Sequence, residues 1–500
     1  MQLNLKDFNF GADLHCFQQG PLNLVLDVVS GAIHHFDPVA WDLLAALEKH
    51  AGDTEAALAE LTAPSHPGLY RESELQEALV ELNDLVAEGT LFNRDPWRKE
   101  LSIKPGDGAE TSFSSGVAAQ LEGLVQAPVI KSLCLNVAHA CNLRCGYCFA
   151  STGNFGGANK LMPFAVGKAA LDFLVHHSAN RQHCEVDFFG GEPLLNFAVV
   201  QQIVAYGRAL EQKTGKQFHF TLTTNAILLD KAIRDYLNEQ EISVVLSLDG
   251  RPEVHDQWRV GVDGSGSYTE ALPRILALTE SREDHEDYYV RGTYTRFNLD
   301  FSADVLHLAD LGFKRVSVEP VVAMEGDAYA LRTADLSQIF TEYERLAELI
   351  REREKEGRGF NFFHFDLSLE HGPCLPKRLK GCGAGHEYVA VTPEGDIYPC
   401  HQFVGRTEYL MGNVLEKQIP NQTLVKSFQQ ANIYGKPVCA QCWARFHCGG
   451  GCHANAEQFN GTIYQPYTLG CAIQKKRLEI AIYIQACRWL ENQRGSMVAP

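Results

Sequence analysis

The residues best suited to chemistry are Cys141, Cys145 and Cys148, spaced as CxxxCxxC at the end of an apolar run, Ser132–Val137. A 4Fe-4S cluster that only carries electrons takes four thiolate ligands. Three clustered thiols would leave one iron without a protein ligand and free to bind a substrate, as an open zinc site does. The spacing therefore predicts an iron–sulfur site with one reactive corner. A zinc site completed by His139 is the alternative.

A second group of candidates follows later apolar stretches. Gly190-Gly191-Glu192-Pro193 comes directly after Val186–Phe189, and its glycines would let the backbone approach a ligand closely. Arg259 carries a guanidinium that matches carboxylate geometry, although a charge on a surface helix is the alternative. The other candidates stand at the ends of strand-like stretches: Asn225, Ser247, Asp249, Glu319 and Val321.

Cysteines are concentrated near the C-terminus. Eight of the fifteen are Cys374, Cys382, Cys400, Cys439, Cys442, Cys448, Cys452 and Cys471. In an apparently cytosolic chain this pattern favours metal binding or catalysis over disulfides, and the thiol count alone also permits two zinc sites. Cys134 and Cys184 lie in apolar stretches and are expected to be core thiols.

Composition excludes several classes of protein. The chain has 500 residues, enough for about three domains. Its formal net charge of −18 argues against a nucleic-acid partner held through phosphates. Met1–Phe10 lacks the pattern of a signal peptide, and no apolar run is long enough to span a membrane. We therefore expect a cytoplasmic protein with no membrane and no nucleic-acid partner.

The central elements alternate between strand and helix patterns. The strand candidates are Ser132–Val137, Glu185–Phe189, Gln217–Thr223, Ser243–Leu248, Tyr288–Thr295 and Lys314–Val318. Helical patterns at Phe164–His176, Phe197–Lys213 and Ser302–Leu311 lie among them. Such alternation predicts a parallel sheet, whose ligands bind at the carboxyl ends of the strands. The candidate residues stand at those ends.

The flanking regions have their own patterns. A hairpin of Asn23–Val29 and Ala32–Phe36 is followed by helices that begin at Asp37, at Glu55 and at Arg71. Asp95–Gln126 is polar and rich in glycine and serine, which predicts a linker. A second hairpin, Tyr388–Val391 with Ile397–Tyr398, lies between Cys382 and Cys400. We expect domains at 1–95, 129–345 and 346–500, with the linker at 96–128.

The CxxxCxxC and Gly-Gly-Glu-Pro motifs resemble those of the radical S-adenosylmethionine (SAM) enzymes. The resemblance implies an α/β fold with a partial (β/α)6 barrel, in which the free iron chelates SAM. It implies that Gly190, Gly191 and Glu192 bind the SAM amino group. It also implies roles toward the SAM carboxylate, ribose or adenine for Asn225, Ser247, Asp249, Arg259, Glu319, Val321 and Tyr147.

The C-terminal cysteines resemble the SPASM iron–sulfur domain, whose pattern is CxnGx4C, then CxxCx5CxxxC, then C. Gly395 stands five residues before Cys400, as this pattern requires. The resemblance implies two auxiliary clusters, and thus three 4Fe-4S clusters in total. Cys382, Cys400 and Cys452 would hold the first auxiliary cluster; Cys439, Cys442, Cys448 and Cys471 would hold the second. Cys374 either completes the first or leaves an iron open to a substrate thiolate.

The N-terminal strands and helices resemble the winged-helix-like peptide-recognition domain of peptide-modifying radical SAM enzymes. In that family a leader peptide adds a strand to the sheet edge. A domain that only stabilises the barrel is the alternative.

Several further segments look like those of the maturases of six-cysteine (SCIFF) peptides. They are Asp187–Leu194, Tyr289–Thr293, Gly372–Cys374, Tyr398–Gly405 and Lys475–Glu479. The resemblance implies reductive SAM cleavage to a 5′-deoxyadenosyl radical, followed by a thioether bond from a cysteine sulfur to an α-carbon, that of threonine. It implies a cysteine-rich precursor peptide and an electron donor such as flavodoxin or ferredoxin as partners.

Two alternatives come from other classes. Anaerobic sulfatase-maturating enzymes also resemble this pattern, but they have an aspartate base where this chain has His401. A non-catalytic electron carrier would not need Gly190–Pro193. The sequence does not identify the peptide, the acceptor residue or the number of crosslinks.

Overall fold

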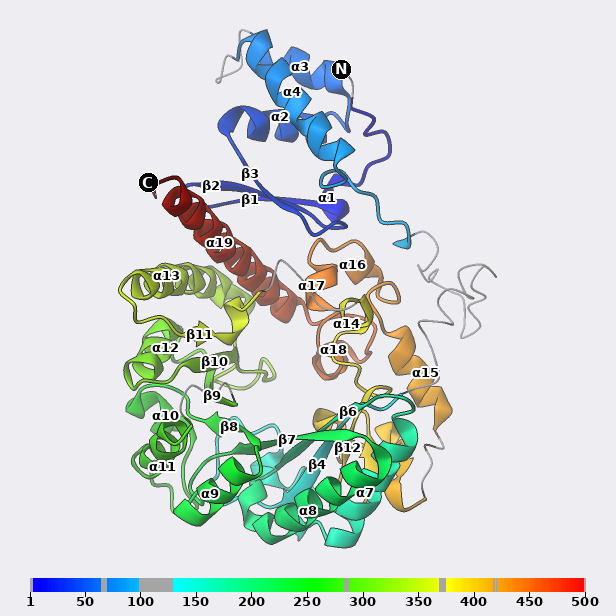
Figure 1. Cartoon of the computed structure of the whole chain (residues 1–500), viewed down its shortest axis with the longest axis vertical. Coiled ribbons are helices and arrows are strands. Elements are labelled where there is room, and N and C mark those ends of the chain that lie inside the picture. Colours follow the sequence, from blue (N-terminus) through cyan, green and yellow to red (C-terminus); the bar gives the residue numbers. More distant parts are fainter. Residues whose placement is uncertain are drawn as a thin grey trace.

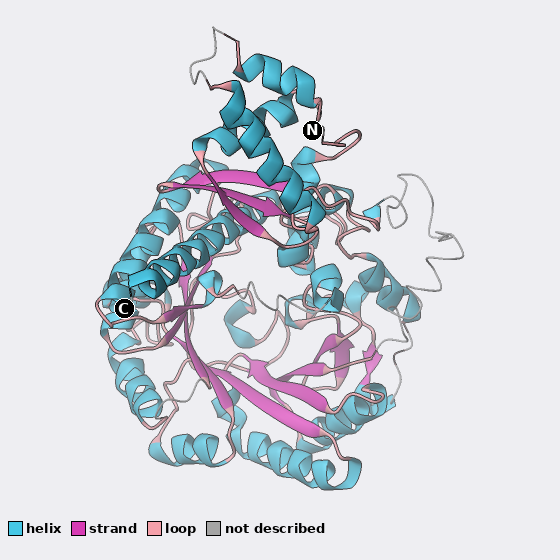
Figure 2. Cartoon of the chain, turned by 45° about the horizontal axis from the view of Figure 1, so that its top comes forward, coloured by secondary structure: helices cyan, strands magenta, loops and turns pink. Residues whose placement is uncertain are grey.

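A computed structural model of the chain describes residues 3–63, 70–98, 129–282, 287–367, 375–416, 419 and 421–498 (Figure 1). Most of the expected linker and Cys374 lie outside these residues. Figure 2 shows a curved central sheet with helices on its outer side, and a small sheet with its own helices at one end. The fold is mixed α/β with a largely parallel central sheet, as the sequence predicts.

The N-terminal part is a three-stranded antiparallel sheet, in the order β1-β2-β3, packed against helices. Its elements are α1 (Phe10–Asp13), β1 (Leu14–Gln19), β2 (Leu22–Asp27), β3 (Ile33–Phe36), α2 (Pro38–Lys49), α3 (Thr54–Leu61) and α4 (Glu72–Ala87). The predicted hairpin and the three predicted helices are confirmed. The sequence analysis missed β1, because its residues, Leu-His-Cys-Phe-Gln-Gln, include no β-branched side chain and do not alternate.

Short polar contacts explain the hairpin turn and the start of α2. Asp27 Oδ1 accepts hydrogen bonds from the backbone and hydroxyl of Ser30, both at 2.8 Å. Asp37 caps α2 by accepting from Ala40 N at 2.8 Å, and Pro38 stands in the first turn, where its missing N–H costs nothing. Leucines of α2 and α4 then form a core separate from that of the central sheet.

The central sheet has the strand order β11-β10-β9-β8-β7-β6-β4-β12-β13-β14, and the strands from β4 to β11 pair in parallel. The strands are β4 (Ser132–His139), β6 (His183–Gly190), β7 (Gln217–Thr224), β8 (Ser243–Ser247), β9 (Tyr288–Tyr294), β10 (Arg315–Pro320) and β11 (Asn361–Phe362). A short strand, β5 (Lys160–Leu161), pairs with β4. All six predicted central strands are confirmed.

Helices connect these strands and pack on the outer face of the sheet (Figure 2). They are α7 (Phe164–His177), α8 (Phe197–Thr214), α9 (Lys231–Glu239), α10 (Pro252–Trp258), α11 (Tyr268–Glu280), α12 (Phe301–Asp310) and α13 (Leu336–Lys355). Side chains such as Leu171, Ile203 and Leu308 of these helices are fully buried. The outer face of the sheet is therefore a hydrophobic core, which leaves the inner face for polar groups.

The central sheet continues into the C-terminal region at both edges. The predicted hairpin, β12 (Tyr388–Val391) and β13 (Asp396–Tyr398), pairs through β12 in parallel with β4. A final strand, β14 (Gly412–Asn413), pairs with β13, and β11 forms the opposite edge. The hairpin that leads to Cys400 is thus hydrogen-bonded to the strand that leads to Cys141.

Short helices and one long helix complete the C-terminal region. They are α14 (Leu375–Lys380), α15 (Gln422–Gln430), α16 (Pro437–Ala440), α17 (Arg445–Cys448), α18 (His453–Asn460) and α19 (Thr468–Val498). Helix α19 runs along α13 toward the small N-terminal sheet (Figure 1), where Glu479 contacts His15 at 3.0 Å. Cys471 lies in the first turn of α19.

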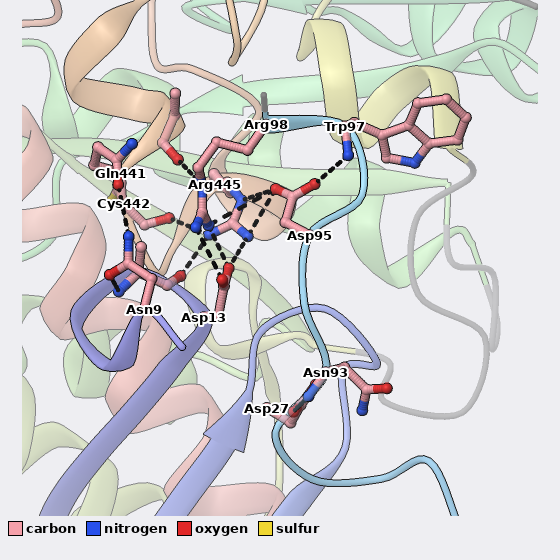
Figure 3. Close-up of polar contacts among 12 residues, drawn as sticks. Asn9, Asp13, Asp27, Asn93, Asp95, Trp97, Arg98, Gln441, Cys442 and Arg445 are labelled. Atoms are coloured by element: carbon pink, nitrogen blue, oxygen red, sulfur yellow. Dashed lines mark hydrogen bonds and ion pairs between the residues drawn. The ribbon is translucent and has the colours of Figure 1, made fainter. Parts of the chain in front are cut away.

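A buried ion cluster joins the N-terminal part to the cysteine-rich region (Figure 3). The Arg445 side chain is fully buried and contacts Asp13 at 2.8 Å and Asp95 at 3.0 Å. Arg98 also pairs with Asp13 and donates to the carbonyl of Ala440 at 3.1 Å. The side chains of Asp95 and Arg98, at the start of the expected linker, are therefore held in place by paired charges.

We expect Asp13→Asn to lower the free energy of unfolding by about 3–5 kcal/mol, because it leaves buried guanidinium groups without a full anionic partner. Glu60→Gln is the matched control: Glu60 pairs with Lys49 on the surface, so its loss should leave the free energy of unfolding nearly unchanged. Anaerobic denaturant unfolding of both variants measures the difference. Equal stability of the two variants would contradict this role of Asp13.

Candidate active site and iron–sulfur centres

The three N-terminal cluster cysteines lie in one loop that follows β4. Leu143 N donates to Cys141 Sγ at 3.4 Å. Burial, with smaller contributions from the charges of Glu192, Cys145 and Cys148, raises the pKa of Cys141 to about 12. Burial also raises the pKa of Cys145, which the charge of Arg259 opposes. The three thiols are therefore close enough to feel one another's charge, and a metal cluster would have to displace their protons.

Glycines at the end of β6 allow the cysteine loop to pack against that strand. A Cβ atom on Gly191 would lie 2.2 Å from Ala140 O, and one on Gly190 would lie 2.3 Å from Ala138 O. Gly191 N and Glu192 N donate to these same two carbonyl groups, at 2.7 and 2.9 Å. The Gly-Gly pair thus holds the loop through main-chain hydrogen bonds that side chains would prevent.

Glu192 organises the ends of two neighbouring strands. Its buried carboxyl group accepts hydrogen bonds from Leu194 N at 3.0 Å, Thr224 Oγ1 at 2.8 Å and Asn225 N at 2.9 Å. Burial raises its pKa to about 7, although these donors oppose the rise. Asn225 Nδ2 in turn donates to Asn142 Oδ1 at 2.8 Å, inside the cysteine loop. The structure thus brings Glu192 and Asn225 next to the predicted cluster ligands.

Tyr147, Asp249 and Arg259 form a buried polar cluster beside the same loop. The Tyr147 hydroxyl donates to Asp249 Oδ2 at 2.5 Å, and Arg259 Nε lies 3.1 Å from the same oxygen. The backbone of Trp258 and Val260 accepts from the cysteine loop. The alternative reading of Arg259 as a surface charge is wrong, because its side chain is only 12% exposed.

The remaining SAM candidates lie farther along the sheet. Ser247 ends β8 and pairs in register with Arg291 of β9. Glu319, at the end of β10, sits among Arg291, His364 and Arg477 at 3.4–3.6 Å. Burial alone would raise the pKa of Glu319, but these neighbours lower it to about 2. Val321 is buried directly after this strand.

The C-terminal thiols of the described residues form two groups. Burial raises the pKa of Cys400 well above its usual range, and the charges of Cys452 and Cys382 add to this effect. Burial raises the pKa of Cys439 to about 12, with added contributions from Cys448, Cys471 and Cys442. We call Cys382, Cys400 and Cys452 the first auxiliary set and Cys439, Cys442, Cys448 and Cys471 the second auxiliary set. That each set ligates a cluster stays a prediction.

Backbone conformation brings the two auxiliary sets together. Gly449, Gly450 and Gly451 have φ values of +68°, +94° and +71°, a conformation that residues with a side chain rarely adopt. They form the sharp turn between Cys448 of one set and Cys452 of the other. Only glycine tolerates three such residues in succession without strain.

His401 links the first auxiliary set to the cysteine loop, which the sequence analysis did not anticipate. Its ring lies 4.9 Å from the Phe189 ring and 5.5 Å from the Phe149 ring. Its Nδ1 lies 3.1 Å from the Tyr388 hydroxyl. Since His401 follows Cys400 and Phe149 follows Cys148, aromatic side chains bridge the two thiol groups.

The donor sets fit iron–sulfur clusters better than single zinc ions. Zinc–sulfur bonds of about 2.3 Å hold the ligands of one ion close together. Among the described residues, no three His, Cys, Asp or Glu side chains are arranged to hold a single metal ion. Each set consists of thiols alone, and a cube of four irons takes thiolate ligands at separate corners.

Comparison with known families supports this assignment. Residues 131–269 match the 4Fe-4S single cluster domain family, and residues 382–443 match the SPASM iron–sulfur cluster-binding domain family. A solved structure described as native anSMEcpe with bound AdoMet superposes with a TM-score of 0.58, at 20% identity, over 70% of this chain and 97% of that one. At this identity the similarity shows a shared fold.

Characterised relatives are similar over most of the chain. A cysteine-type anaerobic sulfatase-maturating enzyme of Clostridium novyi is 24% identical over 63% of this chain and 86% of its own length. The radical SAM cyclopropyl synthase TigE of Paramaledivibacter caminithermalis is 22% identical, over 79% and 81%. The mycofactocin maturase MftC of Mycobacterium ulcerans is 26% identical, over 68% and 87%.

The parallel sheet, the cysteine loop at its carboxyl edge and the matched families define an iron–sulfur α/β enzyme. More particularly, the chain is similar to radical SAM enzymes that modify peptides, and its C-terminal residues 382–443 match the SPASM domain. The electron-carrier alternative is therefore wrong. Within the described residues, we find no helix with the length and apolar character needed to span a bilayer.

We expect Gly191→Ala to remove most of the iron bound by the Cys141 loop, because the new methyl group would collide with Ala140 O. Gly326→Ala is the matched control, since a Cβ atom there meets nothing within 4 Å. Iron content and the electron paramagnetic resonance signal that responds to SAM report the loss. Full iron content and an unchanged signal in Gly191→Ala would contradict the close packing.

Proposed function

We propose that this enzyme forms thioether crosslinks, from cysteine sulfur to a backbone α-carbon of threonine, in a ribosomally made cysteine-rich peptide. The observation that carries the proposal is the first auxiliary set. One of its three thiols, Cys400, directly precedes His401. The His401 ring contacts Phe149, which directly follows Cys148 of the cysteine loop. A peptide thiolate at the open corner of such a set would be held facing the radical site. Cys374 is the residue that decides whether this corner is open.

Three 4Fe-4S clusters and SAM are the proposed cofactors. Cys141, Cys145 and Cys148 would hold the cluster that, together with SAM, supplies a hydrogen-abstracting radical. Glu192 would accept the SAM ammonium and Arg259 would bind its carboxylate. The proposed contacts to the rest of SAM are Tyr147, Gly190, Gly191, Asn225, Ser247, Asp249, Glu319 and Val321. Three hydrogen bonds support these roles. Asn225 N donates to Glu192, Asn225 Nδ2 donates to Asn142 of the cysteine loop, and the Tyr147 hydroxyl of that loop donates to Asp249.

The reaction balances without an external oxidant. One C–H bond and one S–H bond of the peptide break, and one C–S bond forms. The hydrogen atom ends in 5′-deoxyadenosine, the thiol proton goes to solvent, and SAM yields methionine. One electron enters from a donor such as flavodoxin or ferredoxin and one leaves the peptide, for which the auxiliary sets offer an acceptor.

The N-terminal sheet is the proposed site of the leader peptide. Strand β1 contacts the C-terminal region, where His15 stacks on Trp443 with ring centroids 3.6 Å apart. Among the described strands, β3 pairs only with β2, so it offers the edge to which an extended peptide can add. The ion cluster at Arg445 would then keep the bound leader at a fixed distance from the auxiliary sets.

Sulfatase maturation is the second candidate, because a curated relative carries that name. Burial lowers the pKa of His401 to about 4, with a further contribution from Arg291, so the imidazole is neutral near pH 7. A neutral histidine differs from the aspartate expected of sulfatase maturases at this position. Incubation with a sulfatase-derived cysteine peptide and with the cysteine-rich precursor, side by side, separates the two functions.

We expect co-expression with a cysteine-rich precursor peptide to lower the peptide mass by two hydrogen atoms per crosslink. The variant lacking Cys141, Cys145 and Cys148 should give neither crosslinks nor 5′-deoxyadenosine, because no SAM-binding cluster remains. Its control replaces Cys16, Cys184 and Cys487, which lie outside the three thiol groups. Mass spectrometry measures both products. Unmodified precursor with normal 5′-deoxyadenosine formation would overturn the thioether function.

We expect SAM affinity to fall as the pH drops from about 8 to about 6. Glu192, with a pKa of about 7, becomes neutral in this range and loses its attraction for the SAM ammonium. Well below that pKa the loss approaches about tenfold per pH unit. Equilibrium dialysis should show the dependence in wild type and in Glu60→Gln, and a flat, weak binding in Glu192→Gln. A pH-independent wild-type affinity would exclude Glu192 as the ammonium acceptor.

A further inference from the structure

Lys436 is a fully buried lysine between the two auxiliary sets. It stands directly before α16, where its carbonyl accepts from the backbone of Cys439 at 2.8 Å. Its Nζ donates to Gly450 O at 2.7 Å and approaches His453 Nδ1 at 3.2 Å. Gly450 belongs to the turn that separates Cys448 from Cys452, and His453 directly follows Cys452 at the start of α18. The ammonium group is therefore anchored where the two sets meet.

The two anchoring groups are uncharged. Gly450 contributes a carbonyl oxygen, and burial lowers the pKa of His453 to about 3, an effect that the Lys436 charge strengthens. In the described part of the chain, no carboxylate lies within ion-pair distance of this ammonium. Arg445 and Arg477, by contrast, are buried beside carboxylates. A buried cation without an anion is strongly disfavoured.

The anions nearest Lys436 come from cysteines. Burial lowers the pKa of Lys436, while the charges of Cys439 and Cys448 of the second set, and of Cys452 and Cys382 of the first, act in the opposite direction. The lysine thus senses two thiolates from each side. An iron–sulfur cluster bound to such thiolates carries net negative charge, which each added electron increases. A nearby fixed cation favours the reduced form and raises the reduction potential.

We propose that Lys436 is the shared counter-ion of the two auxiliary clusters and raises their reduction potentials. Lys436 acts through its fixed positive charge and does not contact the substrate. The inference rests on the proposed presence of two auxiliary clusters, but not on the identity of the peptide. In this role Lys436 makes the clusters better acceptors for the electron that leaves the peptide.

The test measures cluster potentials in a full-length chain that lacks Cys141, Cys145 and Cys148, so that only the auxiliary clusters contribute. Lys436→Met removes the charge and keeps the length of the side chain. We expect iron and sulfide contents to stay unchanged. The reduction equilibrium of at least one cluster should shift at least tenfold toward the oxidised form, which is 59 mV for a one-electron couple. Potentiometric titration followed by electron paramagnetic resonance provides the readout.

Lys216→Met is the matched control. Lys216 also donates to two backbone carbonyl groups, those of Ala179 and Arg181 at 2.9 Å, but it lies at the surface near the start of β7. Its loss removes the same charge from the chain and should leave both potentials unchanged. A shift of the same size in this variant would assign the effect to overall charge and overturn the proposal.

Lys436→Arg covers the case in which Lys436→Met fails to retain iron. Retention of both clusters by the arginine variant alone would show that a positive charge is needed there and would support the proposal. Equal loss in both variants, or unshifted potentials in a fully loaded Lys436→Met, would overturn it. Absence of auxiliary iron from the chain without these substitutions would instead overturn the proposed function.

Discussion

Strand β4 leads into the cysteine loop and is hydrogen-bonded on both sides to strands that lead to the site, and this pairing sets the geometry of the site. On one side it pairs with β6, which ends in the Gly190-Gly191 turn. On the other side it pairs with β12, whose hairpin partner leads to Cys400. Cys134 of β4 is in register with Asp187 and with Ala390. The separation between the cysteine loop and the first auxiliary set is therefore fixed by one sheet and does not depend on docking between two independent domains.

Buried cations organise the parts of the chain that this sheet does not reach. Arg259 holds Asp249 beside the cysteine loop, Arg477 ties α19 to Glu319, and Arg445 joins the N-terminal part to the second auxiliary set. Each has a carboxylate partner, as a buried charge requires. Lys436 differs because its anions are thiolates. A cation paired with carboxylates only holds parts of the chain together. A cation beside cluster thiolates also changes the reduction potential of the cluster.

The sequence predicted those features that leave a local pattern. The six central strands and both hairpins follow from periodicity and turn residues. The division of the C-terminal cysteines into two ligand sets comes instead from the resemblance to the SPASM domain. The pairing of β12 with β4 joins residues far apart in sequence, so local periodicity does not predict it. Asp95 looked like a linker residue because its partner, Arg445, is equally distant along the chain. The sequence did not single out Lys436, because a lysine near cysteines is usually exposed and only the structure shows that this one is buried.

The fold alone does not determine the reaction, because a function resides in the site that a fold carries. The relatives of this chain include a sulfatase-maturating enzyme, a cyclopropyl synthase and a mycofactocin maturase, all at low identity. What they can share is the means of generating a radical; what differs must lie in groups that face the radical and the substrate. His401 is such a group, because it touches Phe149 and Phe189 and follows an auxiliary ligand candidate. A buried neutral imidazole at this position cannot supply the fixed negative charge of an aspartate. The step that follows hydrogen abstraction therefore needs an anion from another group. A thiolate of the peptide itself meets that requirement.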